Sequence, residues 1–108
     1  MRPLFHPARD DLELSAILHA LSDEIRLRVI KRLHEQGELY CGAIEIDIPK
    51  STLSHHLKVL RESGLVHTRM EGTMRYTTLR KDDLQARFPG LLDTILPLVH
   101  IEASHPHC

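Results

Sequence analysis

The segment between Pro49 and Gly64 constrains the fold of this chain more than any other. Proline suits the first turn of a helix and glycine suits the left-handed position just past its end. The pair therefore predicts a helix that starts at Lys50 and ends before Gly64. Leu65 follows the glycine, and we expect it to fold back onto Leu60. Apolar residues at helical spacing give this helix one buried face, made of Leu53, Leu57 and Leu60.

The pattern changes from helical to alternating directly after this helix. Residues 66–70 alternate between apolar and polar side chains, as strands do, and residues 74–79 have the composition of a return strand. The three residues Glu71-Gly72-Thr73 between them are typical of a turn. The sequence therefore predicts a β-hairpin that follows the helix.

Two further helices are predicted before this unit. Apolar spacing indicates a first helix over about residues 11–20. Ser22 is expected to cap a second helix that ends near Gly37. A short third helix is predicted over 39–46, although isoleucines at every second position from Ile44 alternate as in a strand.

The rest of the chain completes a single domain. Residues 82–88 are expected to form a short helix, and the apolar stretch 91–99 a final helix that Pro97 kinks. Residues 1–10 are expected to be a flexible arm and residues 100–108 a tail, which leaves a domain over 11–99. The predicted fold class is mainly α with a small β-hairpin, a winged helix-turn-helix of about five to six helices plus a two-stranded wing.

Charge is distributed unevenly along the chain. Residues 50–80 contain six basic and two acidic residues, a net charge of +4, whereas the rest, with eight basic and 13 acidic residues, carries −5. A basic face on an acidic body can steer DNA to that face. No run approaches the roughly 20 apolar residues that span a bilayer, and the N-terminus lacks the apolar run of a signal peptide. We therefore expect a cytoplasmic protein that does not contact a membrane.

The outward face of the 50–63 helix carries the chemistry of a groove-binding helix. If its leucines face the core, a step of about 100° per residue turns Ser51, His55 and Lys58 outward. Small hydroxyls approach base edges or phosphates closely, and lysine neutralises phosphate. We also expect Arg69 and Arg75 near the tip of the hairpin to reach the DNA backbone or minor groove. The predicted binding residues for double-stranded DNA are Lys50, Ser51, Thr52, Ser54, His55, Lys58, Arg69 and Arg75.

An enzyme and a protein-binding module are the two alternatives to a DNA-binding protein. An enzyme is not expected, because the sequence contains no phosphate-binding loop and no zinc-protease motif. A winged-helix module that binds only proteins is the alternative, but it would favour exposed hydrophobic residues where Ser51, His55 and Lys58 stand.

Three stretches resemble the ArsR/SmtB family of bacterial repressors. They are Leu21-Ser-Asp-Glu-Ile-Arg-Leu-Arg-Val-Ile, then Lys50-Ser-Thr-Leu-Ser-His-His-Leu-Lys-Val-Leu-Arg-Glu-Ser-Gly-Leu-Val66, then Glu71-Gly-Thr-Met-Arg-Tyr76. The resemblance covers about residues 12–99. It implies a homodimer that represses transcription from an inverted-repeat operator. It also implies dimerisation through the first and last helices, here Leu12, Ile17, Leu91, Leu92, Ile95, Leu96 and Val99.

The ligand sets of the metal-sensing relatives do not match this chain. One set is a Cys-x-Cys pair, where Tyr40-Cys41-Gly42 offers a single thiol. Another begins with Asp-x-His, where Asp93-Thr94-Ile95 lacks the histidine. No cofactor is therefore expected, unless the tail binds a metal through His100, His105, His107 and Cys108.

Thiol chemistry is the second route to an inducer. Cys41 and Cys108 are candidate redox residues, either as a pair or with Cys41 oxidised alone. A repressor released by a thiol oxidant, by a metal or by a small molecule therefore remains open, as does one without an inducer.

Overall fold

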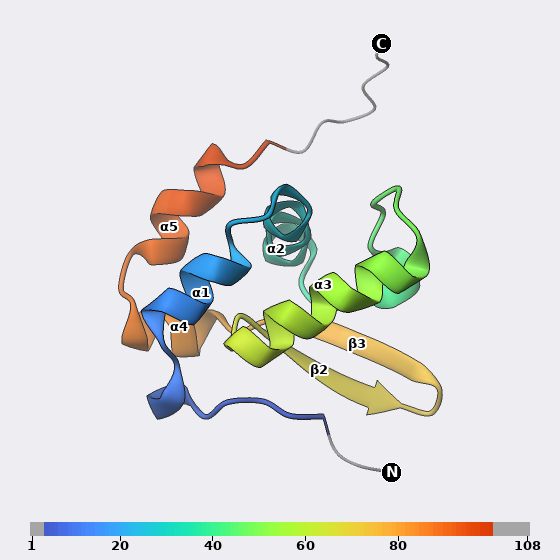
Figure 1. The fold of residues 1–108 in the computed structure, drawn as a ribbon, viewed down its shortest axis with the longest axis horizontal. Coiled ribbons are helices and arrows are strands. Elements are labelled where there is room, and N and C mark those ends of the chain that lie inside the picture. The colour runs from blue at the N-terminus through green and yellow to red at the C-terminus, as the bar shows by residue number, and fades with distance from the viewer. Residues whose placement is uncertain (1–3, 101–108) are drawn as a thin grey trace.

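The computed structural model describes residues 4–100, and its architecture confirms the predicted winged helix-turn-helix (Figure 1). A 3₁₀ turn, η1 (Arg9–Asp11), precedes the first helix, and another, η3 (Leu96–Leu98), follows the last. The helices are α1 (Leu14–Ala20), α2 (Glu24–Gln36), α3 (Lys50–Ser63), α4 (Lys81–Arg87) and α5 (Leu91–Ile95). The strands are β1 (Leu39–Tyr40), β2 (Val66–Glu71) and β3 (Met74–Leu79). None of the helices in residues 4–100 is long and apolar enough to span a membrane.

Helix α3 forms as predicted, because local signals fix both of its ends. Pro49 occupies the N-cap and Gly64 takes the left-handed conformation with φ 94°. The Leu65 amide then donates to the Leu60 carbonyl at 3.0 Å, which is the Schellman ending. Glycine is required at position 64 for a second reason, since a Cβ there would collide with the side chain of Leu12. The three leucines of the apolar face are buried.

The N-cap of helix α2 lies one residue later than predicted. The carboxylate of Asp23, not the hydroxyl of Ser22, caps the helix by accepting hydrogen bonds from the Ile25 and Arg26 amides at 2.8 and 3.1 Å. The Ser22 hydroxyl instead donates to the His19 carbonyl at 2.6 Å. The prediction of Ser22 as the cap is therefore wrong. The helix ends at Gly37, as expected.

The helix predicted over residues 39–46 is also wrong for most of its length. Leu39 and Tyr40 form strand β1, and only residues 41–43 form a helical turn, the 3₁₀ turn η2. Beyond it the Ile46 amide donates to the Ile44 carbonyl, and the Ile48 amide to the Ile46 carbonyl, both at 2.9 Å. These hydrogen bonds skip only one residue, so the chain makes a series of tight γ-turns instead of a helix.

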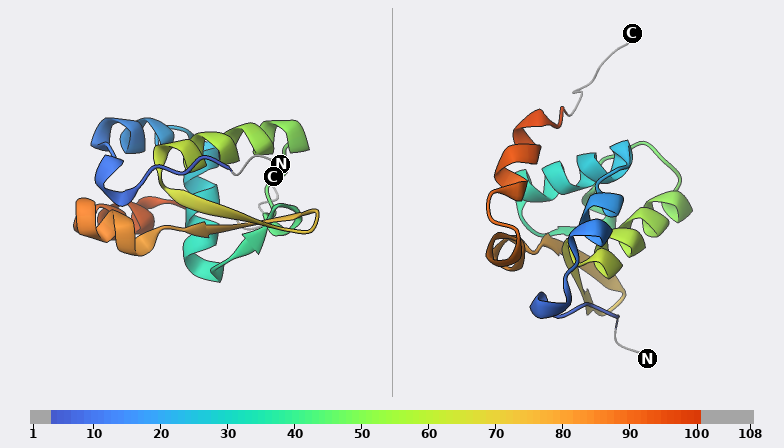
Figure 2. Two further views of the ribbon diagram at one scale, coloured as in Figure 1. Left: turned by 90° about the horizontal axis from the view of Figure 1, so that it is seen from below. Right: turned by 60° about the vertical axis from the view of Figure 1, so that its left-hand side comes forward.

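The hairpin differs from its prediction in two ways. Its turn contains two residues, Gly72 and Thr73, because Glu71 pairs with Met74 across the strands. The sheet has three strands in the order β1-β3-β2, since β1 pairs with β3 through Leu39↔Thr77 and Tyr40↔Tyr76. Beyond Tyr76 the hairpin continues as a two-stranded ribbon, with α3 on one side of it (Figure 2).

The C-terminal part closes the core. Helix α5 ends at Ile95, and the residues around Pro97 form the 3₁₀ turn η3 (Leu96–Leu98). Pro97 therefore does more than kink the helix, because the α-helix ends before it and continues as a 3₁₀ turn. One apolar cluster joins all the helices and both strands of the hairpin, and includes Ile17, Ile30, Leu60, Val66, Leu84 and Leu96.

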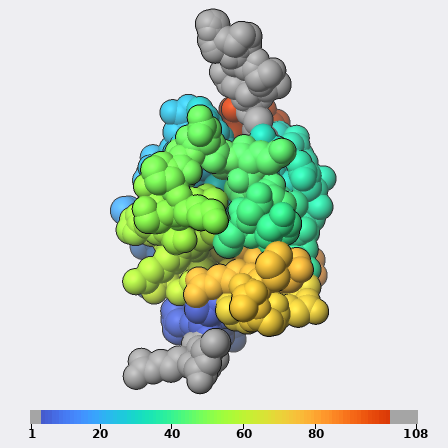
Figure 3. Space-filling model, turned by 90° about the vertical axis from the view of Figure 1, so that its right-hand side faces the viewer, coloured from blue at the N-terminus to red at the C-terminus, as the bar shows by residue number. Residues whose placement is uncertain are grey.

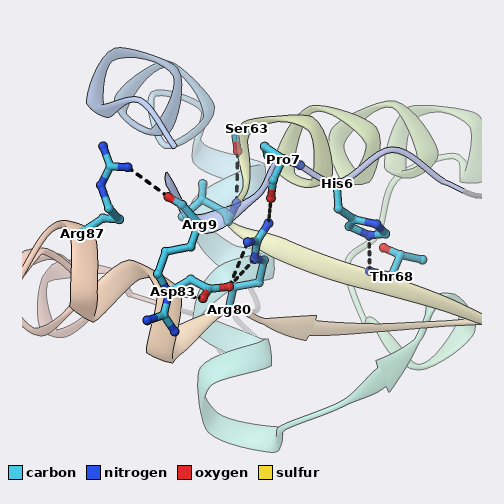
Figure 4. A network of polar contacts seen from close by, with 9 residues as sticks. His6, Pro7, Arg9, Ser63, Thr68, Arg80, Asp83 and Arg87 are labelled. Atoms are coloured by element: carbon cyan, nitrogen blue, oxygen red, sulfur yellow. Dashed lines mark hydrogen bonds and ion pairs between the residues drawn. The ribbon is translucent and has the colours of Figure 1, made fainter. Parts of the chain in front are cut away.

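Residues 4–12, which we call the strap, run along the open edge of β2 and past α4 (Figure 4). Arginines hold the strap by its backbone: Arg61 donates to the Phe5 carbonyl, Arg80 to that of Pro7, and Arg87 to those of Arg9, Asp10 and Leu12. The Thr68 amide donates to Nε2 of His6 at 3.0 Å, which occupies a donor that the edge strand leaves open. The described part of the predicted arm is therefore tied to the domain by hydrogen bonds.

Candidate nucleic-acid interface

Helix α3 presents its predicted binding face to solvent. The side chains of Lys50, Ser51, Thr52, Ser54, His55 and Lys58 are all exposed. The leucines on the opposite face pack into the core, so the orientation of the helix follows from its apolar stripe. The face combines short hydroxyl side chains with two lysines, as the sequence predicted.

A cleft of about 680 Å³ lies between α3 and the hairpin. Its walls include Ser51, Ser54, His55 and Lys58 from α3, and Thr68, Arg75 and Thr77 from the hairpin. A second hollow of about 330 Å³ adjoins it, between the start of α3, the 40–42 segment and the hairpin tip. Figure 3 faces this end of the molecule, where α3, the β1 region and the hairpin come together. The structure therefore brings Arg75 to the same side as the α3 residues.

Three of the six basic residues in 50–80 are engaged within the protein. Arg61 donates to the Phe5 carbonyl, and Arg80 forms an ion pair with Asp83 at 2.8 Å. Arg69 forms ion pairs with two carboxylates. The other three, Lys50, Lys58 and Arg75, make no hydrogen bond or ion pair with another residue of 4–100 and are exposed. These three cations surround the cleft and its adjoining hollow and are available to phosphates.

Arg69 is not brought together with the other predicted DNA-binding residues. It pairs with Tyr76 in the register of the hairpin, one row from the Met70↔Arg75 pair, so its side chain lies on the face of the sheet away from α3. There its guanidinium donates to both carboxylate oxygens of Glu38, at 3.0 and 2.7 Å. The hydrogen bonds from Arg69 hold the pKa of Glu38 below its usual range.

This chain is similar in sequence to known transcriptional regulators. A family described as a helix-turn-helix domain matches residues 21–69. The uncharacterized HTH-type transcriptional regulator YceK of Bacillus subtilis is 44% identical over 89 residues, which are 80% of this chain and 89% of that protein. An arsenical resistance operon repressor of Staphylococcus aureus is 42% identical over 99 residues, 89% of this chain and 86% of that protein.

A solved structure extends the match to three dimensions. The homodimeric winged helix-turn-helix DNA-binding domain of Mb0332 from Mycobacterium bovis, a possible ArsR-family transcriptional regulator, has 31% sequence identity and a TM-score of 0.63. The match covers 88% of this chain and 87% of that one. This chain belongs to the ArsR family. It is a DNA-binding transcriptional regulator, and its winged helix-turn-helix is the DNA-binding unit of that family.

A buried histidine, His56, links α3, the DNA-binding helix of this ArsR-family protein, to the rest of the domain. His56 is buried, and its Nδ1 lies 3.1 Å from Nη1 of Arg26, which also donates through Nε to the Ala20 carbonyl at 2.7 Å. Burial alone would raise the pKa of Asp23, but the Arg26 amide, His56 and the Arg26 charge outweigh it and lower that pKa. The three side chains join α3 to the start of α2. Sequence reasoning missed the contact between Arg26 and His56, because nothing local links residues 30 positions apart.

The apolar residues assigned to a dimer interface divide into two groups. Leu12 and Ile17 are 1% and 0% exposed, and Leu92 and Leu96 are buried, so these four belong to the core of the protomer. Leu91, Ile95 and Val99 are half-buried. The exposed apolar residues on this side are Leu14, Leu18 and Leu98, which sequence reasoning did not select. A groove of about 600 Å³ lies among Leu18, Leu21, Leu27, Ile95, Leu98 and Val99.

The candidate effector residues fall partly outside the structure. Cys41 is a free, half-buried thiol in the walls of both hollows beside α3. His100 is exposed, whereas His105, His107 and Cys108 lie outside the described residues. Within 4–100 there is no group of three or more metal-ligating side chains.

Proposed function

We propose that this ArsR-family regulator is a homodimeric repressor that binds an inverted-repeat operator in the cytoplasm, with α3 in the major groove and the hairpin over the adjacent backbone. The observation that carries the proposal is a set of three exposed cations around the cleft that pair with no other residue of 4–100, namely Lys50, Lys58 and Arg75. Two similar proteins support repression and dimerisation, since one is an arsenical resistance operon repressor and the other is a homodimer.

In this proposal the polar and the cationic side chains of the cleft have separate tasks. Ser51, Ser54 and His55 have short or planar polar ends that can approach base edges, so we assign them to the selection of sequence. Lys58 and Arg75 flank them from different elements and supply phosphate contacts that fix the register of the helix in the groove. A dimer would repeat this arrangement on two half-sites about 34 Å apart along the DNA.

The test is the salt dependence of binding to the DNA upstream of the protein's own operon. Each dimer would lose two phosphate contacts in the Lys58→Ala or the Arg75→Ala variant, so we expect the slope of log K against log salt to decrease by about 1.8 for either. Lys81→Ala is the matched control, because Lys81 is an exposed cation on α4 and does not line the cleft. Unchanged slopes in both cleft variants would contradict the proposal.

A finer proposal concerns release from DNA through Cys41. The thiol lines both hollows, next to Ser54 and Arg75, so atoms added to it would occupy space that the DNA backbone needs. This location favours a thiol-reactive effector over the tail metal site as the signal.

A further inference from the structure

Arg69 lies at the centre of a polar cluster on the outer face of the sheet. Its Nε and Nη2 donate to the two oxygens of Glu38 at 3.0 and 2.7 Å, and its Nη1 donates to Glu71 at 2.8 Å. Its guanidinium carbon lies 4.5 Å from the centre of the Tyr76 ring. We call Glu38, Arg69, Glu71 and Tyr76 the latch. The latch spans the sheet, since Arg69 is on edge strand β2, Tyr76 on central strand β3, and Glu38 directly before β1.

The latch occupies the row where the sheet changes from three strands to two. Tyr40, Tyr76 and Arg69 form the last row in which all three strands are paired. The next row, Met70↔Arg75, has no third strand, and a two-stranded ribbon is marginally stable by itself. The direction in which Arg75 points therefore depends on how the ribbon is held at its base.

We propose that Arg69 is a positioning residue, which fixes the direction of the hairpin so that Arg75 faces the α3 cleft, and that it does not bind phosphate itself. This inference rests on the proposed function. Two carboxylates surround one guanidinium, so the charged groups of the latch carry a net −1 and would repel DNA from the outer face. The same guanidinium donates three hydrogen bonds to these carboxylates and stacks on an aromatic ring.

The geometry of the latch requires arginine rather than any cation. A lone exposed ion pair contributes little, but the fork on both Glu38 oxygens, the third bond to Glu71 and the stacking on Tyr76 act together. Lysine would keep the charge and lose the fork and the stacking. A phosphate ligand, in contrast, tolerates lysine because a point charge is sufficient. The lysine variant therefore separates the two roles.

The experiment compares Arg69→Lys and Arg69→Gln with Arg75→Lys and Arg75→Gln on the operator. We expect both Arg69 variants to weaken binding alike, by about three- to tenfold, because a loosened hairpin must be ordered on binding. Their salt slopes should stay at the wild-type value. Arg75→Gln should lower the slope by about 1.8, and Arg75→Lys should keep it.

Amide hydrogen exchange supplies a readout of the hairpin itself. We expect exchange in residues 70–75 to rise in both Arg69 variants, with no change in α3. Wild-type affinity in Arg69→Lys together with a reduced slope in Arg69→Gln would overturn the inference, as would unchanged exchange in 70–75. A flat slope in Arg75→Gln would contradict the proposed function instead, so the two failures are distinguishable.

Discussion

Two hollows of similar size lie at opposite ends of the molecule, and their linings differ in chemistry. The cleft between α3 and the hairpin, of about 680 Å³, is lined by hydroxyl, imidazole and cationic side chains. The groove between α1, α2 and α5, of about 600 Å³, is lined mainly by leucine, isoleucine and valine. Volume alone would not distinguish them, but free cations suit a polyanion and exposed apolar side chains suit an apolar partner surface.

The comparison separates two ways in which a substitution can abolish DNA binding. A change in the cleft should alter the salt dependence of binding and leave the oligomeric state unchanged. A change in the groove should alter the oligomeric state and weaken binding only because one half-site is then lost. Measuring both quantities on each variant tests whether the two surfaces have separate roles.

The largest effect is expected in the groove, from Leu98→Glu. Leu98 is 71% exposed in the protomer, so the substitution spares the core, but it would place a charge in an apolar interface. We expect a monomer at micromolar concentration by light scattering and DNA affinity reduced by more than about 100-fold, since each half-site then binds alone. Leu98→Met, which conserves volume and apolarity, is the control. A Leu98→Glu dimer with wild-type affinity would show that the groove has another purpose.

The sequence predicts α3 and its exposed face because their signals are local. Pro49, Gly64 and the leucine spacing all lie within the element that they define. The dimer residues cannot be predicted in the same way, because an apolar stripe does not show which of its residues are buried in the core of the protomer. Leu12 is buried against the turn at Gly64, 52 positions away, whereas Leu18 remains exposed.

Arg69 and Arg75 illustrate how one residue of turn length decides a site. A three-residue turn over 71–73 would pair Arg69 with Arg75 and place both on one face. The observed two-residue turn pairs Met70 with Arg75, so the two arginines face opposite ways. Strand β1 and the Glu38 contact could not be predicted either, because both depend on contacts between residues 31 to 38 positions apart.

A smaller effect is expected from modification of Cys41, which tests whether added bulk in the cleft interferes with DNA binding. A maleimide on Cys41 would add bulk to the walls of both hollows, so we expect operator affinity to fall by about 10- to 100-fold with the oligomeric state unchanged. The experiment uses the Cys108→Ser variant, in which Cys41 is the reactive thiol. The insensitive control carries Cys41→Ser in the same Cys108→Ser background. Full DNA binding by the Cys41 adduct would show that the thiol lies outside the footprint of the DNA.

The smallest effect is expected in the strap, which runs from α4 to the cleft, where Leu4 forms part of the wall. His6 must be neutral at Nε2 to accept the Thr68 amide, and it stacks on His67 with ring centres 4.2 Å apart. Burial, followed by the charges of His67 and Arg61, lowers the pKa of His6.

A histidine whose pKa is lower in the folded state stabilises the fold above its unfolded pKa of about 6.5, and this contribution is lost as the pH falls through the lower folded value. We expect His6→Ala to cost up to about 1 kcal/mol of unfolding free energy at pH 8. The difference from wild type should shrink on acidification below about pH 6.5. Urea unfolding at several pH values measures it, with His34→Ala as the control because His34 is exposed on α2. If the His6→Ala and wild-type stabilities stayed parallel from pH 8 to pH 5, the strap would not depend on the neutral imidazole, and the link between α4 and the cleft would rest on the arginine contacts alone.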